Sequence, residues 1–388
     1  MKKIKAGIIG TGFIGPAHIE AVRRLGFVDV VGIAEMGNTL AKQKAEKLFI
    51  PKFYGDYKEL LADKEIQVIH NCTPNSVHFK ISGDIIKAGK HIISEKPLAM
   101  NSSEGAKLVK LAKEKGVVNA VDFNYRFYPL VQEAKAMVQK GKIGKIFSIM
   151  GSYLQDWLFL DTDYSWRVEP ELGGSLRAVG DIGSHWCDLI QFISGKKIIS
   201  VFADIKTLHK IRKKPKKPIE TYSNKVLKES DFTRKNVTTE DYATLLLDFE
   251  GGTKGVVTVC QTCAGRKNRL FFEIYGSRSS LAWDQERPNE MWVGYREKAN
   301  ELLLKDPSLL SSEAKAYAFY PGGHPEAYPD GLKNFLLSVY TFIKEGKDPL
   351  KNKPNFSTFA DGNEELLICD AVLESSRTGK WAKVKNSA

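Results

Sequence analysis

Three side chains that could move a proton lie in the middle of the chain. They follow a stretch that begins at Gly173, and Asp181, His185 and Asp188 stand there at positions i, i+4 and i+7. On an α-helix these positions form one stripe. A histidine beside a carboxylate suits a general base for an alcohol, because its pKa is near neutral and its tautomer is fixed. The alternatives are a polar helix start without chemistry and a metal site, since the ligand types fit.

A lysine stands at a second position suited to chemistry. Residues 91–94 predict a buried strand, and Glu95, Lys96 and Pro97 follow it. Proline fixes the backbone after Lys96 and biases that residue towards an extended conformation. An ammonium group held there could stabilise a developing alkoxide. The alternative is an ordinary surface lysine in a loop.

The N-terminus predicts a dinucleotide site. Residues 4–9 predict a buried strand that leads into a G-x-G-x-x-G turn and a helical pattern. In this context the glycines permit a tight turn and the close approach of a pyrophosphate. Glu35 ends the next predicted strand, where an acidic residue binds the adenosine ribose and repels a 2′-phosphate. The predicted cofactor is therefore NAD, with NADP disfavoured. The residues of the turn assigned to it are Gly10, Gly12, Phe13, Ile14 and Gly15.

The order of predicted elements indicates two domains. Strands and helices alternate up to about residue 123, which predicts an N-terminal Rossmann domain with a doubly wound parallel sheet over 1–123. Residues 124–388 predict an α+β domain with a large, mostly antiparallel open sheet. An alternative for the C-terminal helix is that it packs back on the first domain. An open sheet with helices on one face leaves the other to be covered, so a homodimer or homotetramer through this sheet is expected.

Composition narrows the class of protein. The 388 residues are 43% hydrophobic and 27% charged, as in an ordinary globular protein. No apolar run is long enough for a membrane span, and no signal-peptide pattern begins the chain, so a cytoplasmic enzyme without a membrane partner is expected. Cys260 and Cys263 have C-x-x-C spacing, but a strand would point them to opposite faces, which argues against a redox or metal role.

A basic segment interrupts the second domain. Residues 206–235 carry much of the net charge of +12. Such a run could bind nucleic acid. Few aromatic residues accompany it and it connects two predicted strands, so a solvated insertion loop and no nucleic-acid partner are expected.

The motifs together resemble the Gfo/Idh/MocA oxidoreductases. They stand in the family's order and cover essentially the whole chain, down to a helix start at Asp361 and Gly362. The resemblance implies nicotinamide-dependent oxidation or reduction of sugars or cyclitols and a C-terminal sheet that mediates dimers or tetramers. It implies a catalytic trio of Lys96, Asp181 and His185. It also implies further cofactor contacts at Thr73, Pro74, Asn75, His78, Glu95, Lys96, Arg126, Trp166 and Arg167.

The residue types then suggest a reaction. His185 accepts the proton of a secondary alcohol, Lys96 stabilises the alkoxide, and no metal is required. Aromatic and polar side chains around these groups suit a neutral pyranose, glycoside or cyclitol. Two alternatives remain: a redox-neutral glycoside-cleaving enzyme with tightly bound NAD, and a non-catalytic sensor of NAD or sugar. The predicted substrate contacts are Lys96, Tyr153, Asp156, Trp157, Asp181, His185 and His324.

Overall fold

The computed structural model describes residues 3–216 and 229–385, and these group into two compact units. The first unit contains residues 1–124 and 328–366. The second contains residues 125–327 and 367–386. The sequence analysis assigned everything after residue 123 to the second domain, apart from the C-terminal helix, whereas residues 328–366 group with the first unit.

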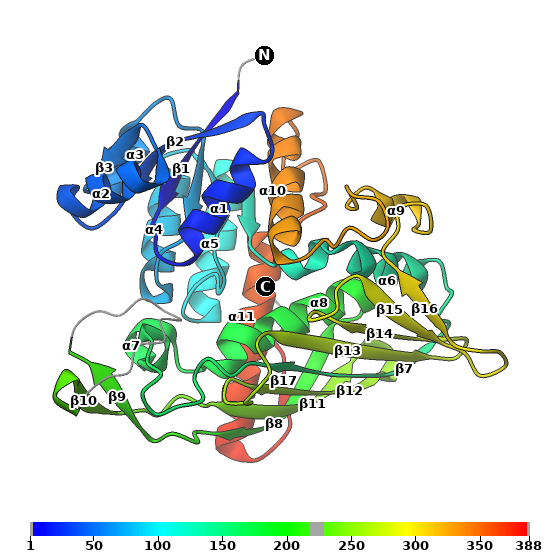
Figure 1. Cartoon of the computed structure of the whole chain (residues 1–388). Coiled ribbons are helices and arrows are strands. Elements are labelled where there is room, and N and C mark those ends of the chain that lie inside the picture. The colour runs from blue at the N-terminus through cyan, green and yellow to red at the C-terminus, as the bar shows by residue number, and fades with distance from the viewer. Residues whose placement is uncertain (1–2, 217–228, 386–388) are drawn as a thin grey trace. The chain divides into compact units, whose positions relative to one another are not determined.

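The first unit is built on a parallel six-stranded sheet with the order β3-β2-β1-β4-β5-β6 (Figure 1). The order reverses between β1 and β4, so the carboxyl ends of these two strands flank the crevice in which such sheets bind ligands. Strands of this kind are buried on both faces and therefore have continuous apolar sequences. The strands are β1 (Ile4–Ile9), β2 (Val28–Ala34), β3 (Lys52–Tyr54), β4 (Val68–Asn71), β5 (His91–Ser94) and β6 (Asn119–Val121).

Helices complete the first unit. Five of them connect the strands: α1 (Ile14–Arg23), α2 (Asn38–Leu48), α3 (Tyr57–Ala62), α4 (Asn75–Lys87) and α5 (Ser102–Lys115). Helix α10 (Tyr328–Lys344) joins them because its apolar side chains, such as Phe335, are buried and its Asp330 pairs with Arg24 at 2.6 Å. Helix α11 (Phe359–Thr378) contributes Phe359 and Leu366 to the core of this unit.

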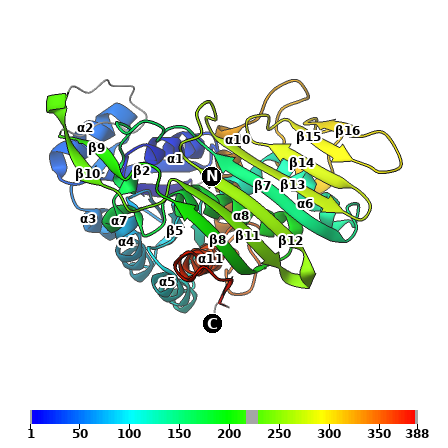
Figure 2. The same ribbon diagram turned by 90° about the horizontal axis from the view of Figure 1, so that it is seen from below.

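The second unit contains a nine-stranded sheet in which only β7 and β12 pair in parallel (Figure 2). This confirms the predicted class, an α/β protein with a Rossmann sheet followed by a mostly antiparallel one. Helices α6 (Pro129–Gln139) and α8 (Ser184–Ser194) lie behind the sheet in Figure 2, which leaves the strands in view. In order across the sheet the strands are β16 (Glu301–Leu304), β15 (Glu290–Gly294), β14 (Ser280–Asp284), β13 (Arg269–Gly276), β7 (Ile146–Leu154), β12 (Lys254–Cys260), β11 (Tyr242–Phe249), β8 (Ile198–Lys206) and β17 (Ala382–Lys383).

The basic segment differs from its prediction as a solvated loop. Its described flanks form β9 (Ile211–Pro215) and β10 (Phe232–Asn236), which pair as an antiparallel ribbon. Arg212 within this ribbon is fully buried, because three backbone carbonyls and the carboxylate of Asp241 surround its guanidinium group. A count of charges along the sequence cannot reveal such an internal partner. The middle of the segment, 217–228, lies outside the described residues.

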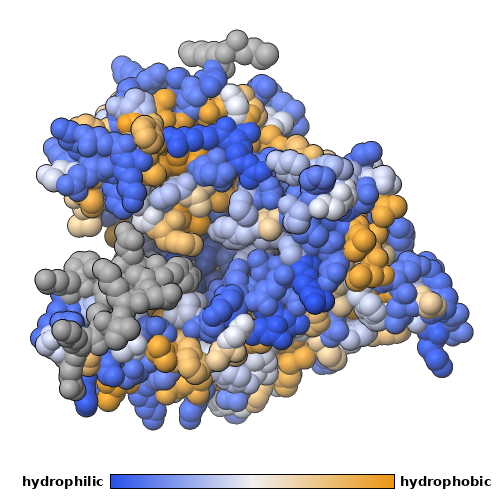
Figure 3. All heavy atoms as spheres, in the orientation of Figure 1, coloured by the Kyte–Doolittle hydropathy of each residue, from blue (hydrophilic) through white to orange (hydrophobic). Residues whose placement is uncertain are grey.

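Short elements account for the other differences. The strands β3, β16 and β17 are between two and four residues long, and so gave no periodic signal. The second domain opens with a 3₁₀ turn, Asn124–Phe127, and α6 begins after it at Pro129, because proline favours the first turn of a helix. The surface seen in Figure 3 is largely hydrophilic, with apolar side chains in separate groups. Within the described residues, no helix is long and apolar enough to cross a membrane.

Candidate active site

The glycine-rich turn of the first unit has the features that a pyrophosphate requires. Gly10, directly after β1, has a φ of 86°, which favours glycine. A side chain added at Gly12 would meet nothing within 4 Å, so the backbone there is open to a ligand. Helix α1 begins two residues later without a side-chain cap. Its first N–H groups suit an anion, and the turn therefore fits a dinucleotide.

Glu35 follows β2 and contacts the same turn. Its Oε1 accepts hydrogen bonds from the backbone N–H of Thr11 and from Thr11 Oγ1, the latter at 2.6 Å. These bonds hold the carboxylate beside the start of α1. A fixed negative charge at this place is what discriminates between a ribose hydroxyl and a 2′-phosphate.

The loop after β4 supplies the next predicted residues. Pro74 precedes α4, and Asn75 is the first residue of that helix. The hydroxyl of Thr73 donates to Asn71 Oδ1 at 2.6 Å. His78 is fully buried, with its Nε2 2.7 Å from the carbonyl oxygen of Thr73 and its Nδ1 2.7 Å from that of Pro97. The predicted cofactor residue His78 thus connects this loop to the turn that carries Lys96.

Glu95 and Lys96 follow β5, at the same edge of the parallel sheet. The carboxylate of Glu95 points to the interior, where its Oε1 lies 2.9 Å from His18 Nε2. Lys96 is partly exposed. Lys96 belongs to the first unit, and Asp181 and His185 belong to the second.

In the second unit, the helix predicted to carry Asp181 and His185 is not a regular α-helix throughout. Residues Val179–Gly183 form a π-helical turn (η3), and α8 begins at Ser184. A π-turn shifts the phase of a helix and occurs often at functional sites. Asp181 therefore stands on the wide turn and His185 on the first turn of α8, instead of on one continuous α-helical stripe.

Asp181 has partners that the sequence analysis missed. Its Oδ2 accepts a hydrogen bond of 2.9 Å from Gln261 Nε2, and its Oδ1 lies 3.4 Å from Arg167 Nε. Arg177 donates to Gln261 Oε1 at 3.1 Å, which fixes the orientation of that amide. Arg167, predicted at the cofactor, also stacks on Trp166 with its Cζ 4.5 Å from the ring centroid. These contacts offset the charge of Asp181 and fix its orientation.

A polar and aromatic cluster surrounds the imidazole of His185. The ring of Tyr125 meets that of His185 edge to face, with centroids 5.0 Å apart. The hydroxyls of Tyr125 and Tyr153 are 2.7 Å apart, and Tyr153 donates to Asn268 Oδ1 at 2.8 Å. Gln155 Nε2 donates to the same oxygen at 2.7 Å. Hydroxyls and amides beside a histidine suit a ligand that carries several hydroxyl groups.

The third residue of the predicted stripe has a different partner. Asp188 is buried and accepts hydrogen bonds from Arg126 through two nitrogens, with Nε at 2.8 Å. Paired carboxylate and guanidinium groups in this geometry form a strong, directional contact. Arg126, predicted at the cofactor, thus fixes α8 to the segment before α6, and Asp188 is occupied by a cation of the protein itself.

Of the remaining predicted substrate contacts, Asp156 and His324 have other neighbours than the His185 cluster, and Trp157 is connected to it. Asp156 accepts hydrogen bonds from Lys267 Nζ at 2.6 Å and from the backbone N–H of Gly265 at 3.0 Å. Trp157 donates from Nε1 to Gln155 Oε1 at 2.8 Å, which connects it to the His185 cluster. His324 is exposed and lines a hollow of about 500 Å³ with Asn289 and Lys305.

The sequence predicts that Cys260 and Cys263 point to opposite faces of one strand, and this prediction is wrong. Strand β12 ends at Cys260, so Cys263 lies in the following turn, and its thiol is close enough to interact with that of Cys260. Burial and the neighbouring thiol raise the pKa of Cys263 to about 12. A thiol with a raised pKa is a poor nucleophile, which again argues against redox chemistry.

Gln155, Gln261 and Asn268 are the functional candidates that sequence reasoning missed. Gln155 stands next to the predicted Asp156, and Gln261 lies inside the C-x-x-C pair. Neutral amides have no distinctive spacing, and these three lie just outside the ends of β7, β12 and β13. Only the sheet register brings them together.

Comparison with known proteins gives consistent matches along the chain. Residues 4–123 match an oxidoreductase family with an NAD-binding Rossmann fold, and residues 131–282 match the GFO/IDH/MocA C-terminal domain. Levoglucosan dehydrogenase of Pseudarthrobacter phenanthrenivorans is 30% identical, with 99% of both chains covered. Myo-inositol 2-dehydrogenase of Thermotoga maritima is 26% identical and covers 98% of this chain and 99% of its own. A levoglucosan dehydrogenase structure in complex with NADH and levoglucosan superimposes with a TM-score of 0.87 at 28% identity, over 99% of this chain and 100% of that one.

Proposed function

Because the chain belongs to the GFO/IDH/MocA family of oxidoreductases, we propose that it transfers a hydride between NAD and a ring secondary alcohol or ketone of a sugar, glycoside or cyclitol. The observation that supports this most directly is the cluster of hydroxyl and amide groups around His185 and Asp181. Two relatives are named for ring polyols, levoglucosan and myo-inositol.

In the proposed mechanism three side chains act on the substrate hydroxyl. NAD, when bound, supplies the hydride acceptor. His185 takes the proton of the substrate hydroxyl on a ring nitrogen, because the hydride leaves carbon only as that proton leaves oxygen. Lys96 stabilises the developing negative charge on the oxygen. Asp181, held by Gln261 and Arg167, orients the substrate hydroxyl or the imidazole.

The test is a screen of sugars, glycosides and cyclitols, including levoglucosan and myo-inositol, for NAD-dependent formation of NADH. We expect turnover of at least one ring polyol. Turnover of 2-hydroxy acids alone would contradict the proposal. Cleavage of a glycoside by protein that retains NAD through purification would instead favour the redox-neutral reaction, and sugar binding without any turnover would favour a sensor.

Glu35 gives a prediction on the cofactor. Its carboxylate is fixed at the turn and repels a 2′-phosphate, so kcat/KM with NAD should exceed that with NADP by about 10- to 100-fold, or roughly 1–3 kcal/mol. Glu35→Ala should reduce this ratio, whereas Glu46→Ala, on the exposed face of α2, should leave it unchanged. Steady-state kinetics with both cofactors measures the ratio. Equal or better kinetics with NADP in the wild-type protein would contradict the prediction.

Asp156 and His324 give a prediction on the substrate. If they bind sugar hydroxyls, Asp156→Ala and His324→Ala should each raise KM for the sugar by about 10-fold, the value of one hydrogen bond to a charged or polar group, with KM for NAD unchanged. Lys267→Ala removes the partner of Asp156 and keeps the carboxylate, so it separates sugar binding from the ion pair. Normal sugar KM in both variants would show that these residues lie outside the pocket.

We also propose that the nine-stranded sheet forms a homodimer or homotetramer interface. One row of paired residues crosses its open face and is apolar except for Glu273. The row consists of Phe202, Leu246, Val256, Met150, Glu273, Ala282, Trp292 and Leu302. Leu246 and Met150 are 43% and 42% exposed, and a continuous exposed apolar patch indicates an interface.

Light scattering after gel filtration tests this interface. Leu246→Glu should lower the molar mass of the oligomer, because it places a charge in the middle of the row. Leu309→Glu, at a leucine that is 62% exposed and lies outside the sheet, should not. A wild-type protein that runs as a monomer would overturn the proposal.

The surroundings of the basic ribbon support the absence of a nucleic-acid partner. Lys213 pairs with Asp161 at 3.0 Å, and Glu169 accepts both Lys214 at 2.8 Å and Lys235 at 3.4 Å. Cations that are already paired within the protein bind phosphates less well.

The five cysteines are all free thiols, which fits the proposed cytoplasmic location.

A further inference from the structure

We propose that two buried histidines, His18 and His78, position Lys96 by holding the residues on either side of it. The inference rests on the proposed function, in which Lys96 stabilises the alkoxide. His18 contacts the side chain of Glu95, and His78 contacts the backbone carbonyl of Pro97. Lys96 lies between these two residues. Neither histidine touches the reacting atoms in this proposal, so both are positioning residues.

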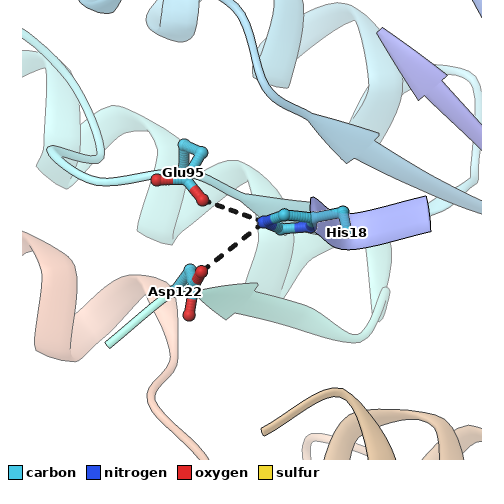
Figure 4. Close-up of side chains that lie close together, drawn as sticks. All are labelled: His18, Glu95 and Asp122. Carbon is cyan, nitrogen blue, oxygen red and sulfur yellow. Dashed lines mark hydrogen bonds and ion pairs between the residues drawn. The ribbon is translucent and has the colours of Figure 1, made fainter. Parts of the chain in front are cut away.

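His18 is buried in the first unit, where its ring faces the carboxyl groups of Glu95 and Asp122 (Figure 4). Its Nε2 lies 2.9 Å from Glu95 Oε1 and 3.5 Å from Asp122 Oδ2. Its Nδ1 lies 2.7 Å from Nδ1 of His70, whose Nε2 is 2.7 Å from the hydroxyl of Tyr340. The hydrogen-bonded chain therefore runs from α10 through β4 and α1 to the residue before Lys96.

The geometry and the electrostatics together indicate which histidine carries the proton. A bond between two Nδ1 atoms needs one donor and one acceptor. His70 fits the acceptor, because burial and the charge of His18 lower its pKa and keep it neutral. His18 then donates from both nitrogens as an imidazolium. Burial acts to lower its pKa, but Cys72, Asp122 and Glu95 outweigh burial and raise the pKa well above its usual value.

The two carboxyl groups respond to this cation in opposite ways. Burial acts to raise the pKa of Glu95, but the hydrogen bond and charge of His18, followed by the charge of Lys96, lower it. Burial and the charge of Glu95 raise the pKa of Asp122. Glu95 is therefore the ionised partner of His18. A carboxylate that is held by a buried cation restricts the position of the turn.

A metal ion is the other reading of His18, Glu95 and Asp122, which have ligand types within 4.8 Å of one another. Ligands at 2.0–2.1 Å in a tetrahedral site lie roughly 3.3 Å apart. The separation of 2.9 Å between His18 Nε2 and Glu95 Oε1 is that of a direct hydrogen bond. His70 already occupies the second nitrogen of His18. Both ring nitrogens of His18 are thus engaged within the protein without an ion.

His78 holds the other side of the turn. Its ring lies between the carbonyl oxygens of Thr73 and Pro97, each at 2.7 Å. Burial lowers its pKa, while the two carbonyls and Glu95 act in the opposite direction. Whichever nitrogen donates, the ring fills the space between the loop after β4 and the turn after β5. Lys96 is therefore tied to the loop that is predicted to contact the cofactor.

Three variants and one matched control test the proposal. His18→Ala removes the donor to Glu95, and His18→Gln restores a neutral donor that can reach it. His91→Gln is the matched control: this partly buried histidine begins β5 and bonds the backbone N–H of Val118, about four residues or roughly 13 Å along the strand from Glu95. His78→Ala examines the second contact.

We expect His18→Ala to lower kcat by about 10- to 100-fold, the effect of a small displacement of a catalytic group, with KM for NAD within about threefold of wild type. His18→Gln should recover part of the loss, and His91→Gln should keep wild-type kcat. Equal losses in His18→Ala and His18→Gln, or a loss confined to NAD binding, would overturn the proposal.

Hydrogen exchange followed by mass spectrometry gives a readout that needs no substrate. A peptide covering residues 95–100 should exchange faster in His18→Ala and His78→Ala than in the wild type and in His91→Gln, because the turn opens more often. Unchanged exchange would overturn the proposal even if the enzyme turns over sugars. Faster exchange in a protein that oxidises no polyol would support the positioning and refute the proposed function. Activation of the wild-type enzyme by Zn²⁺, or loss of its activity on treatment with a chelator, would favour a metal site.

Discussion

His185→Ala should lower kcat by about 10²- to 10⁴-fold while KM for NAD remains nearly unchanged, because it removes the general base and leaves the dinucleotide turn intact. The imidazole is buried, at 8% exposure, and lies against the ring of Tyr125. The substitution therefore removes a side chain whose position its neighbours fix. His209→Ala, a histidine of the same unit that bonds the carbonyl of Phe159, is the control and should keep activity. Stopped-flow or steady-state formation of NADH measures the effect.

Lys96→Ala should reduce turnover at least as much, since the developing alkoxide loses the cation that is proposed to stabilise it. If the two residues act in one step, the double variant should be little worse than the poorer single variant. Retained activity in both single variants would contradict the assignment. Activity that is lost with a chelator and survives both substitutions would show that a metal ion performs the chemistry.

The first unit could be predicted from the sequence because its signals are local. A strand, a G-x-G-x-x-G turn and a helix follow one another within twenty residues, and parallel buried strands have continuous apolar sequences. Glu35 and Lys96 could be placed at strand ends by the same reasoning. The grouping of α10 with this unit could not, because the contact of Tyr340 with His70 joins residues that are 270 positions apart.

The candidate site of the second unit was predicted less completely. The residue types and spacing pointed to Asp181 and His185, but helical periodicity cannot distinguish an α-helix from a π-turn at Val179–Gly183. The partner of Asp188 could not be identified, because Arg126 lies 62 residues away on another element. Gln261 follows β12 and Asn268 precedes β13, and their place beside the site depends on the pairing of both strands with β7. The sequence thus predicts which residues carry the proposed chemistry, and the tertiary contacts show which side chains hold Asp181 and Asp188 in place.

The second large effect concerns stability and the buried carboxylate of Asp241. Asp241 and its partners Arg177 and Arg212 are fully buried. Its Oδ1 accepts from both guanidinium groups, with Arg212 at 2.7 Å, and its Oδ2 accepts the backbone N–H groups of Leu208 and His209 at 2.7 and 3.0 Å. This carboxylate joins the basic ribbon to the segment that carries Asp181. Removing it leaves two buried cations without their shared anion.

Asp241→Ala should therefore destabilise the second unit by about 3–5 kcal/mol, the usual cost of breaking a buried ion pair. For a unit of this size the unfolding midpoint should fall by roughly 6–20 °C. Asp161→Ala is the control, because its pair with Lys213 is partly exposed and should contribute less than about 1 kcal/mol. Calorimetry or circular dichroism measures both variants, and equal shifts would contradict the argument.

The pH dependence gives an independent check of the same group. Burial acts to raise the pKa of Asp241, but the charges and hydrogen bonds of Arg177 and Arg212 prevail and lower it. A carboxyl group with a lowered folded-state pKa stabilises the fold fully above its unfolded value, about 3.9, and loses this contribution as the pH falls through the folded value. The difference in unfolding free energy between wild type and Asp241→Ala should therefore be constant near neutral pH and shrink in acid. A difference that grows as the pH falls would show that Asp241 is protonated in the folded protein, and that its hydrogen bonds, rather than its charge, hold the two arginines.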